Sequence, residues 1–424
     1  MRVSTQQIFQ TGLAGMLQQQ STLNNLSEQL STGNALNNPA TNPTAYNQVL
    51  NLGSRIANLQ SYQQNNQYVQ QNLQLSSSTL QSVGTLINQV QQLAVQMNNG
   101  TVNGSDLQNA VTAMQGNLQQ LVQLANTQDA NGKYIYGGTQ DGSSPFALQS
   151  NGQVIYQGDG GTNSLQIGPS LSVPSNQPGS AIFMDIPAGN GTFTVTPSAA
   201  NYSSNSSGTV TLGPGSVLDP AAAQAAFVAS GVSYQISISQ NSSSGMTFTV
   251  SSGTGNPVSS WSSVSSGTYT PGQSIQIPGP NGPLAAVTAQ GTPGSGQTDS
   301  FTLGAAKPQS LFQTFQDIIT ALQAGNGSAA ANTQRAQGLS NALANLSAAQ
   351  TQLLSVQAGI GSQLQQAQSV STLNSNLTEQ FQTTQGNLAD ISYPQVITQF
   401  QESSTALQAA QKAFVQVQGL SLFN

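Results

Sequence analysis

Residues 69–97 read VQQNLQLSSSTLQSVGTLINQVQQLAVQM. Their apolar residues recur at steps of three and four, with the polar Ser76 in one slot. This spacing places the apolar side chains on one stripe of an α-helix, and a sustained repeat of 3.5 residues is typical of a coiled-coil seam. The stripe comprises Val69, Leu73, Leu80, Val83, Ile87, Val90, Ala94 and Met97. The stretch therefore predicts one long helix, over residues 44–98, that packs against other helices.

The same pattern continues after the turn signals Asn99-Gly100 and Asn103-Gly104, and it returns near the other end of the chain. We expect Ser105 to cap the helix that follows, since a serine side chain can accept a hydrogen bond from a free N–H of the first turn. The predicted core positions are Leu107, Val111, Met114 and Leu118 in the first stretch and Leu343, Leu346, Leu353 and Ile360 in the second. Together these stripes predict an antiparallel bundle in which the chain goes out and comes back.

The middle of the chain has a different pattern. Short runs of alternating or β-branched residues are separated by Gly, Pro and Asn-Gly, as in antiparallel hairpins. The expected strands lie at 153–156, 192–195, 209–212, 233–238, 247–250 and 274–277. The sequence thus predicts an α+β fold: a long antiparallel helical rod built from both termini, with an all-β domain inserted into it.

These patterns divide the chain into three regions. Pro39 and Pro43 separate the first helix from the second, because proline lacks the backbone donor that a helix interior needs. We assign residues 1–43 and 385–424 to a terminal coiled-coil domain, 44–137 and 308–384 to a helical rod domain, and 138–307 to an outward β-rich domain.

The terminal segments carry apolar stripes of their own. A first helix is expected over residues 5–32, and a last one begins at Pro394, where proline is tolerated in the first turn. Two short amphipathic helices are marginal in water and cannot bury their stripes completely against each other. The stripes therefore predict contacts between subunits, through Phe9, Leu13, Met16, Leu23, Leu30, Ile397, Phe400, Leu407, Phe414 and Val417.

The chain is unusually poor in charge. Charged residues make up 4% of the sequence, with 6 Lys and Arg against 12 Asp and Glu, and ordinary globular proteins have about 25%. A nucleic-acid binder needs a clustered basic face, and polybasic membrane attachment needs one too, so both are excluded. The sequence contains no run of 18 apolar residues, so it predicts no helix that spans a membrane.

Whole classes of chemistry are missing as well. The sequence has no His and no Cys, which excludes imidazole bases, thiolate nucleophiles, disulfides and Cys/His zinc sites. We expect no cofactor, no metal site and no catalytic residues, and hence not an enzyme. The N-terminus also lacks the apolar segment of a secretory signal, so we expect any export to proceed without a cleaved signal peptide.

The low charge allows two interpretations. A protein with few Lys and Arg avoids the self-repulsion that drives unfolding in acid, which suits an acidic habitat. The alternative is neutral compositional drift. The sequence leaves both open.

A few residues invite a more specific hypothesis. Gly132-Lys133 lacks the first glycine and the Ser/Thr of a phosphate-binding loop. Asp129, Asp141 and Asp159 are expected to be solvated loop carboxylates rather than a catalytic pair. Trp261, the sole tryptophan, is expected to pack at the centre of the β domain, and a ligand platform is the alternative.

Several motifs resemble one known family. The motif LSTGNALNNPATNP at residues 30–43 is similar to the N-terminal motif of bacterial flagellins and hook–filament junction proteins, where it follows a terminal helix. GKYIYGG at 132–138, VIYQGDG at 154–160, the start MRVST and the ending LSLF at 420–423 are similar to the junction branch of that family. In one respect the chain departs from the family pattern: it has Asn, Ala and Thr where members usually carry charged residues after Gly33.

The resemblance implies a structural subunit of the bacterial flagellum that joins hook to filament. It implies ring assembly with copies of itself, and contacts with a neighbouring hook-associated protein and with hook or filament subunits. It also implies an extracellular location on the flagellum, reached by signal-less type III export with a chaperone on the C-terminal helix. Two alternatives remain open: filament flagellin, and a surface adhesin or glycan-binding protein with a helical stalk.

Overall fold

The computed structural model describes residues 5–40, 42–203, 206–241, 245–255, 257–325 and 327–421. Two parts of the sequence prediction lie outside the described residues: the side chain of Val417 and the family motifs at residues 1–4 and 422–423. The chain forms two compact units. Unit 1 comprises residues 1–66, 166–171 and 369–424, and unit 2 comprises 67–165 and 172–368. The predicted α+β fold, with helices from both ends and an inserted antiparallel β domain, is confirmed. The three-domain division stays a prediction.

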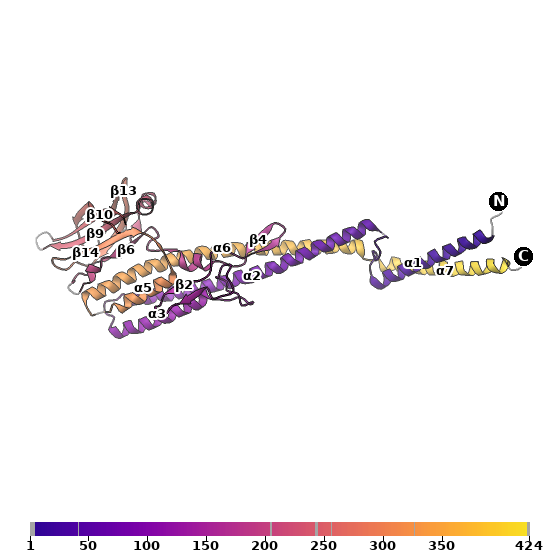
Figure 1. The fold of residues 1–424 in the computed structure, drawn as a ribbon, viewed down its shortest axis with the longest axis horizontal. Helices are drawn as coiled ribbons and strands as arrows, with labels where there is room; N and C mark the ends of the chain where they lie inside the picture. The colour runs from indigo at the N-terminus through magenta and orange to yellow at the C-terminus, as the bar shows by residue number, and fades with distance from the viewer. Residues whose placement is uncertain are drawn as a thin grey trace. The chain divides into compact units, whose positions relative to one another are not determined.

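In unit 1 the two terminal helices lie side by side (Figure 1). These are α1 (Thr5–Thr32) and α7 (Tyr393–Ser421). The ring centroids of Phe9 and Phe414 are 4.5 Å apart, and Nε2 of Gln19 donates to the carbonyl of Ser403 at 3.3 Å. The two helices are antiparallel, because Phe9 near the start of α1 contacts Phe414 near the end of α7, whereas Gln19 further along α1 contacts Ser403 earlier in α7.

Two longer helices contribute to both units. These are α2 (Pro43–Met97) and α6 (Ala329–Ala389). Within unit 1, Nε2 of Gln63 on α2 donates to Oγ of Ser371 on α6 at 2.6 Å. Within unit 2, a Cβ added at Gly84 would lie 3.3 Å from Cδ2 of Leu353, so the two helices approach closely there.

Unit 2 adds two shorter helices to the bundle, α3 (Gly104–Ala125) and α5 (Leu311–Gln323). The predicted rod-core residues lie in this unit. Leu343 is only half-buried, and the others are buried: Val69, Leu73, Leu80, Val83, Ile87, Val90, Leu107, Val111, Met114, Leu118, Leu346, Leu353 and Ile360. A fully buried Leu or Val contributes roughly 1.5–3 kcal/mol, so this interior holds the helices of the unit together.

The start of α3 differs from the sequence prediction, because Asn103 and not Ser105 is its N-cap. Oδ1 of Asn103 accepts from the backbone N–H of Asp106 at 2.9 Å, and the Asp106 carboxylate accepts in return from the backbone N–H of Asn103 at 3.4 Å. This reciprocal pair is a capping box, and its acidic residue also suits the positive end of the helix dipole.

We expect Asn103→Ala to lower the free energy of unfolding by about 1 kcal/mol, because it leaves a helix donor without its partner. Urea unfolding followed by circular dichroism measures the change. Gln108→Ala, at an exposed position of the same helix, is the control and should change stability by less than about 0.5 kcal/mol. Equal effects of the two substitutions would contradict the capping role.

An aromatic cluster fills the region of unit 2 where the loops meet the helices. Tyr136, Phe146, Phe183 and Phe312 are buried there, and the ring centroids of Phe146 and Phe183 are 5.4 Å apart in an edge-on arrangement. The short elements of this part of the chain are β1 (Phe146–Leu148), β2 (Val154–Tyr156), a single-turn π-helix (Ser180–Met184) and β5 (Ile186–Pro187), which pairs with β15 (Pro308–Gln309). A separate hairpin comprises β3 (Ser164–Gly168) and β4 (Leu171–Pro174). Phe183 and Phe312 thereby tie the loop region to α5.

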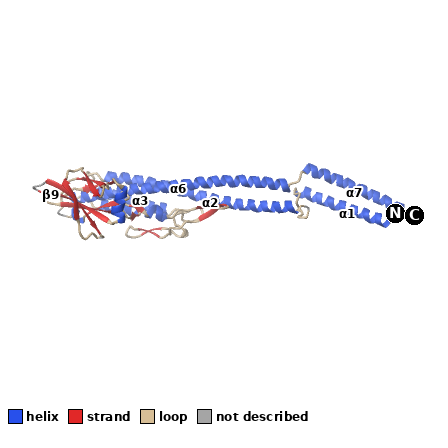
Figure 2. Ribbon diagram, turned by 90° about the horizontal axis from the view of Figure 1, so that it is seen from above, coloured by secondary structure: helices blue, strands red, loops and turns tan. Residues whose placement is uncertain are grey.

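The β domain has two antiparallel sheets, whose strands Figure 2 shows grouped in red. The larger sheet has the order β11 (Ser262–Thr268), β10 (Gly245–Thr254), β9 (Val232–Asn241), β14 (Thr298–Ala305) and β6 (Phe193–Pro197). The smaller has β12 (Ser274–Gly279), β13 (Gly282–Gln290), β7 (Thr211–Leu212) and β8 (Ser216–Val217). Three short helical segments complete the domain: residues Ala199–Tyr202, α4 (Pro220–Ala223) and Gln224–Ala229.

The two faces of the larger sheet differ in chemistry. On one face Tyr234, Ile236, Phe301 and Leu303 are buried in a core that they share with the smaller sheet. Since side chains alternate along a strand, the intervening residues form the opposite face. These are Thr194, Thr196, Ser233, Gln235, Ser237, Ser239, Thr247, Thr249, Ser251, Thr298, Ser300 and Thr302, and none of them is apolar or charged.

Trp261 does not lie in this core. The prediction that it packs at the centre of the β domain is wrong, because the tryptophan is half-exposed at the end of the loop between β10 and β11. Phe193, Phe227 and Tyr234 fill the centre instead, with ring centroids 5.0 Å and 5.4 Å apart.

Candidate functional site

The turn that ends α1 positions the terminal helices. Gly33 adopts φ +72°, a conformation that favours glycine, and thereby ends the helix. Backbone hydrogen bonds then pin the turn to the segment before α7: Ala35 N–H donates to the Ala389 carbonyl at 2.6 Å, and Ile391 N–H donates to the Gly33 carbonyl at 3.2 Å. The motif at residues 30–43 therefore holds the end of α1 beside the start of α7.

The packing between α1 and α7 follows a strict heptad. The seam on α1 comprises Phe9, Gly12, Met16, Gln19, Leu23, Leu26 and Leu30, and the seam on α7 comprises Val396, Phe400, Ser403, Leu407, Ala410 and Phe414. Both follow alternating steps of three and four, which is the knobs-into-holes spacing. Leu26 and Val396, which the sequence prediction did not include, are buried, whereas the predicted residues on the seam are half-buried: Phe9, Met16, Leu23, Leu30, Phe400, Leu407 and Phe414. Most of the predicted interface stripe is thus occupied inside one chain.

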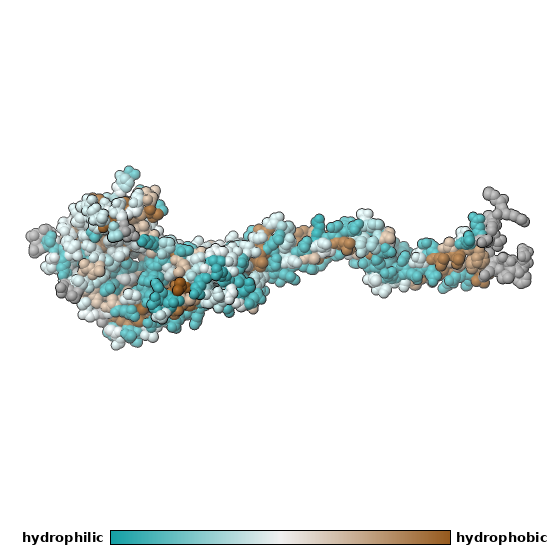
Figure 3. Space-filling model, in the orientation of Figure 1, coloured by the Kyte–Doolittle hydropathy of each residue, from teal (hydrophilic) through white to brown (hydrophobic). Residues whose placement is uncertain are grey.

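Two of the predicted interface residues lie off this seam. Leu13 is 48% exposed and Ile397 is 44% exposed. Sequence reasoning missed Leu17 and Val415, which are 59% and 65% exposed. Figure 3 shows apolar side chains, coloured brown, gathered on these terminal helices. An unpartnered apolar surface on a helix pair is the feature that association with other subunits would cover.

Gly12 and Ser403 are the reason that the sequence prediction misplaced part of the seam. Both occupy heptad positions but are not apolar, so a search for apolar steps passes over them and shifts to Leu13 and Ile397. Both residues face the partner helix: a Cβ on Gly12 would lie in ordinary contact, 3.4 Å from the ring of Phe414, and the Ser403 carbonyl accepts from Gln19.

The loop acids of unit 2 are engaged in structural contacts. Burial would raise the pKa of Asp129, but hydrogen bonds from the Lys133 backbone and the Tyr68 hydroxyl, the latter at 2.7 Å, hold it below its usual range. Nζ of Lys133 pairs with Asp141 at 2.9 Å. The Thr139 side chain and backbone donate to Asp159 and lower the pKa of that carboxyl. These carboxylates therefore join their loops to neighbouring segments of unit 2.

Neither a metal centre nor a membrane span emerges from the described parts of the chain. No three acidic side chains among them gather closely enough to hold a metal ion. Within the same residues, no helix combines the length and the apolar character needed to cross a bilayer.

Comparisons with known proteins agree with the motif resemblance. The family model described as the bacterial flagellin N-terminal helical region matches residues 3–141. The chain is 30% identical over 188 residues to flagellar hook-associated protein 3 of Escherichia coli, which is 44% of this chain and 58% of that relative. The chain thus spans little more than half the length of this curated relative.

Two solved structures from Legionella pneumophila are similar over most of the chain. A flagellar hook-associated protein-3 is 27% identical with a TM-score of 0.68, covering 80% of this chain and 98% of the other. The flagellar junction protein FlgL is 25% identical with a TM-score of 0.67, covering 81% and 100%. These findings confirm that the chain resembles the bacterial flagellin and hook–filament junction family.

Proposed function

We propose, from this resemblance to the flagellin and hook–filament junction family, that the chain is a structural subunit of the bacterial flagellum that joins hook to filament. The relatives named above are hook-associated and junction proteins, which favours this function over filament flagellin. The same names describe no catalytic activity, so we propose that the chain is not an enzyme.

The observation that carries the proposal is the pair of terminal helices. Their seam holds α1 to α7 within one chain, and Leu13, Leu17, Ile397 and Val415 remain exposed on the outside of the pair. Covering these side chains would remove further apolar surface from water, at roughly 25 cal/mol per Å², and a ring repeats that contribution at every subunit contact. The function is then mechanical: the subunit adapts the packing of the hook to that of the filament.

The partners follow from this role. We propose that the subunit forms a ring with its own copies and contacts a neighbouring hook-associated protein and hook or filament subunits. It leaves the cell by the flagellar export route without a cleaved signal peptide, with a chaperone on α7, and is located outside the cell. The terminal helices carry only Glu28, Glu402 and Lys412 as charged side chains along the described parts of α1 and α7, so contacts between subunits rest on apolar and amide groups.

Electron microscopy of flagella from cells that express a labelled subunit tests the proposal. The label should form one short band between hook and filament. A labelled filament flagellin in the same cells is the control and should decorate the whole filament. Label along the filament, or label on the cell surface away from flagella, would contradict the junction role.

A further inference from the structure

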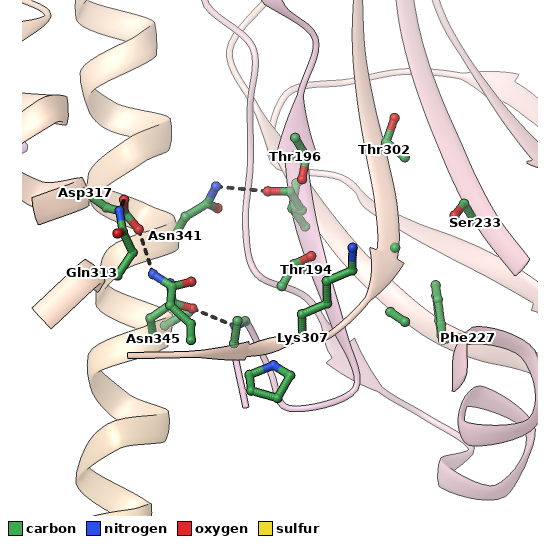
Figure 4. Close-up of a pocket in the computed structure, with 18 of the residues that line it drawn as sticks. Thr194, Thr196, Phe227, Ser233, Thr302, Lys307, Gln313, Asp317, Asn341 and Asn345 are labelled. Carbon is green, nitrogen blue, oxygen red and sulfur yellow. Dashed lines mark hydrogen bonds between the residues drawn. The ribbon is translucent and has the colours of Figure 1, made fainter. Parts of the chain in front are cut away.

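Unit 2 contains a wide cleft of about 1540 Å³ that the proposed function does not use. One wall is the polar face of the larger sheet, and the opposite wall comes from α5 and α6 (Figure 4). The volume exceeds the 300–1,000 Å³ typical of a site for a single small molecule, so it suits an extended ligand.

Two asparagines of α6 join the helical wall to neighbouring parts of unit 2 by hydrogen bonds. Nδ2 of Asn341 donates to the Val195 carbonyl at 2.9 Å, and Nδ2 of Asn345 donates to Oε1 of Gln309 at 3.2 Å. Oδ1 of Asn345 in turn accepts from the backbone of Gly189 at 2.6 Å. Two of these bonds link α6 to the β domain or its adjoining loop, so they fix the helical wall relative to the sheet wall.

The sheet wall presents hydroxyl groups without partners. Among the described residues, the side chains of Thr194, Thr196, Ser233 and Thr302 have no hydrogen-bond partner, although all four line the cleft. Beyond the cleft, on the same face, neighbouring hydroxyls pair with each other. These pairs are Ser237 with Ser300 at 3.1 Å and Ser239 with Thr298 at 2.8 Å. The hydroxyls in the cleft are therefore available to a ligand.

Trp261 stands at the rim of the same cleft. It is half-exposed, and it packs beside Gly253, where an added Cβ would lie 3.4 Å from Cε3 of the indole. An aromatic ring supported from one side offers a flat apolar surface and a polar N–H to a ligand. The C–H face of a sugar ring matches such a surface.

The charge of the cleft selects the class of ligand. Of its lining residues only Asp185, Lys307 and Asp317 are ionisable, which leaves a formal charge near −1 and disfavours polyanions. Hydroxyl and amide groups supply the remaining polar contacts. We propose that this cleft binds a neutral oligosaccharide, which stacks on Trp261 and hydrogen-bonds to the threonine and serine hydroxyls of the sheet. The proposal does not depend on the junction role.

Because Trp261 is the only tryptophan, its fluorescence reports directly on the cleft. Titration of the full chain with neutral hexasaccharides of glucose, galactose, mannose and N-acetylglucosamine should shift the emission to shorter wavelength. The shift should saturate for at least one of them, with a Kd between about 10 μM and about 1 mM. Calorimetry on the same solutions gives an independent affinity.

Two variants locate the binding. Thr302→Val removes one hydroxyl from the cleft and should weaken binding about two- to tenfold, while Thr247→Val, on the same face but outside the cleft, should leave it unchanged. Trp261→Ala should weaken binding at least about tenfold by calorimetry. The proposal is overturned if no neutral hexasaccharide binds at about 10 mM. Equal effects of Thr302→Val and Thr247→Val, or tighter binding of sulfated glycans, would also overturn it.

Discussion

A chain that ends at Pro394 is expected to abolish swimming while unit 2 stays folded. The truncation removes α7 and with it one side of the heptad seam, from Val396 to Phe414. α1 then loses the helix against which it packs, and an isolated amphipathic helix of its length is marginal in water. Unit 2 contains no residue beyond 368, so its core is untouched. Swimming halos in soft agar and filament counts by electron microscopy measure the first effect, and thermal unfolding of the purified chain measures the second.

Gln401→Ala is the matched control, since this exposed residue of α7 lies off the seam. It should swim like the unaltered strain. Normal motility of the truncated chain would refute the role of the terminal pair in assembly. Loss of the folded β domain in the truncated protein would refute the independence of unit 2.

The second large effect is expected from Asp299, a carboxyl in β14 that is 3% exposed. Oδ2 of Asp299 has no hydrogen-bond partner among the described residues. Gly208 packs against this carboxylate so closely that a Cβ on Gly208 would clash with it. Burial raises the pKa of Asp299 from 3.8 to about 6, against the lowering effect of the Val210 backbone N–H. Tyr202 and Tyr269 are the titratable groups that feel its charge, and both are neutral at pH 7: burial, and then the Asp299 charge, raises the pKa of Tyr269 to about 12 and that of Tyr202 further.

The sign of the pH dependence follows from this shift. Between pH 3.8 and 6 the folded chain binds more protons at Asp299 than the unfolded chain, so the contribution of this group to stability is full below 3.8 and is lost as pH rises through 6. The total is at most about 3 kcal/mol, since each unit of pKa corresponds to about 1.4 kcal/mol. We therefore expect Asp299→Asn to remove that slope and to raise stability at pH 7.5 relative to the unaltered chain.

Urea unfolding at pH 5 and pH 7.5, followed by Trp261 emission, measures this difference within the β domain. Asp185→Asn, at an exposed carboxylate, is the control and should keep the slope. The same slope in Asp299→Asn and the unaltered chain would contradict the prediction. A β domain that gains stability on acidification would agree with the acid-adaptation interpretation of the low charge.

Helical periodicity was the most reliable signal in the sequence. The prediction of a first helix over residues 5–32 agrees with α1 as observed, because Gly33 and the prolines that follow leave few ways to continue a helix. Strands with β-branched alternation, such as β9 and β12, were also predictable. By contrast β11 was missed, since its sequence SSVSSGT has almost no apolar residue and is held by pairing with β10 rather than by burial.

The candidate sites were less predictable. The seam of the terminal helices includes Gly12 and Ser403, which are not apolar, so their place in the seam is visible only beside the partner helix. The cleft is lined by hydroxyls that resemble those of any loop in the sequence, and they gain meaning only because strand pairing aligns Thr196 with Thr302 on one face.

The sequence by itself determined which segments are helical, that both ends of the chain form a helix pair, and which chemistries are absent, because periodicity and composition are local properties. Only the tertiary structure decided which stripe residues face inward and which stay exposed, and that Trp261 borders a cleft instead of filling a core. Those outcomes depend on how helices and sheets pack against one another, and residues far apart in the chain compete for the same buried volume.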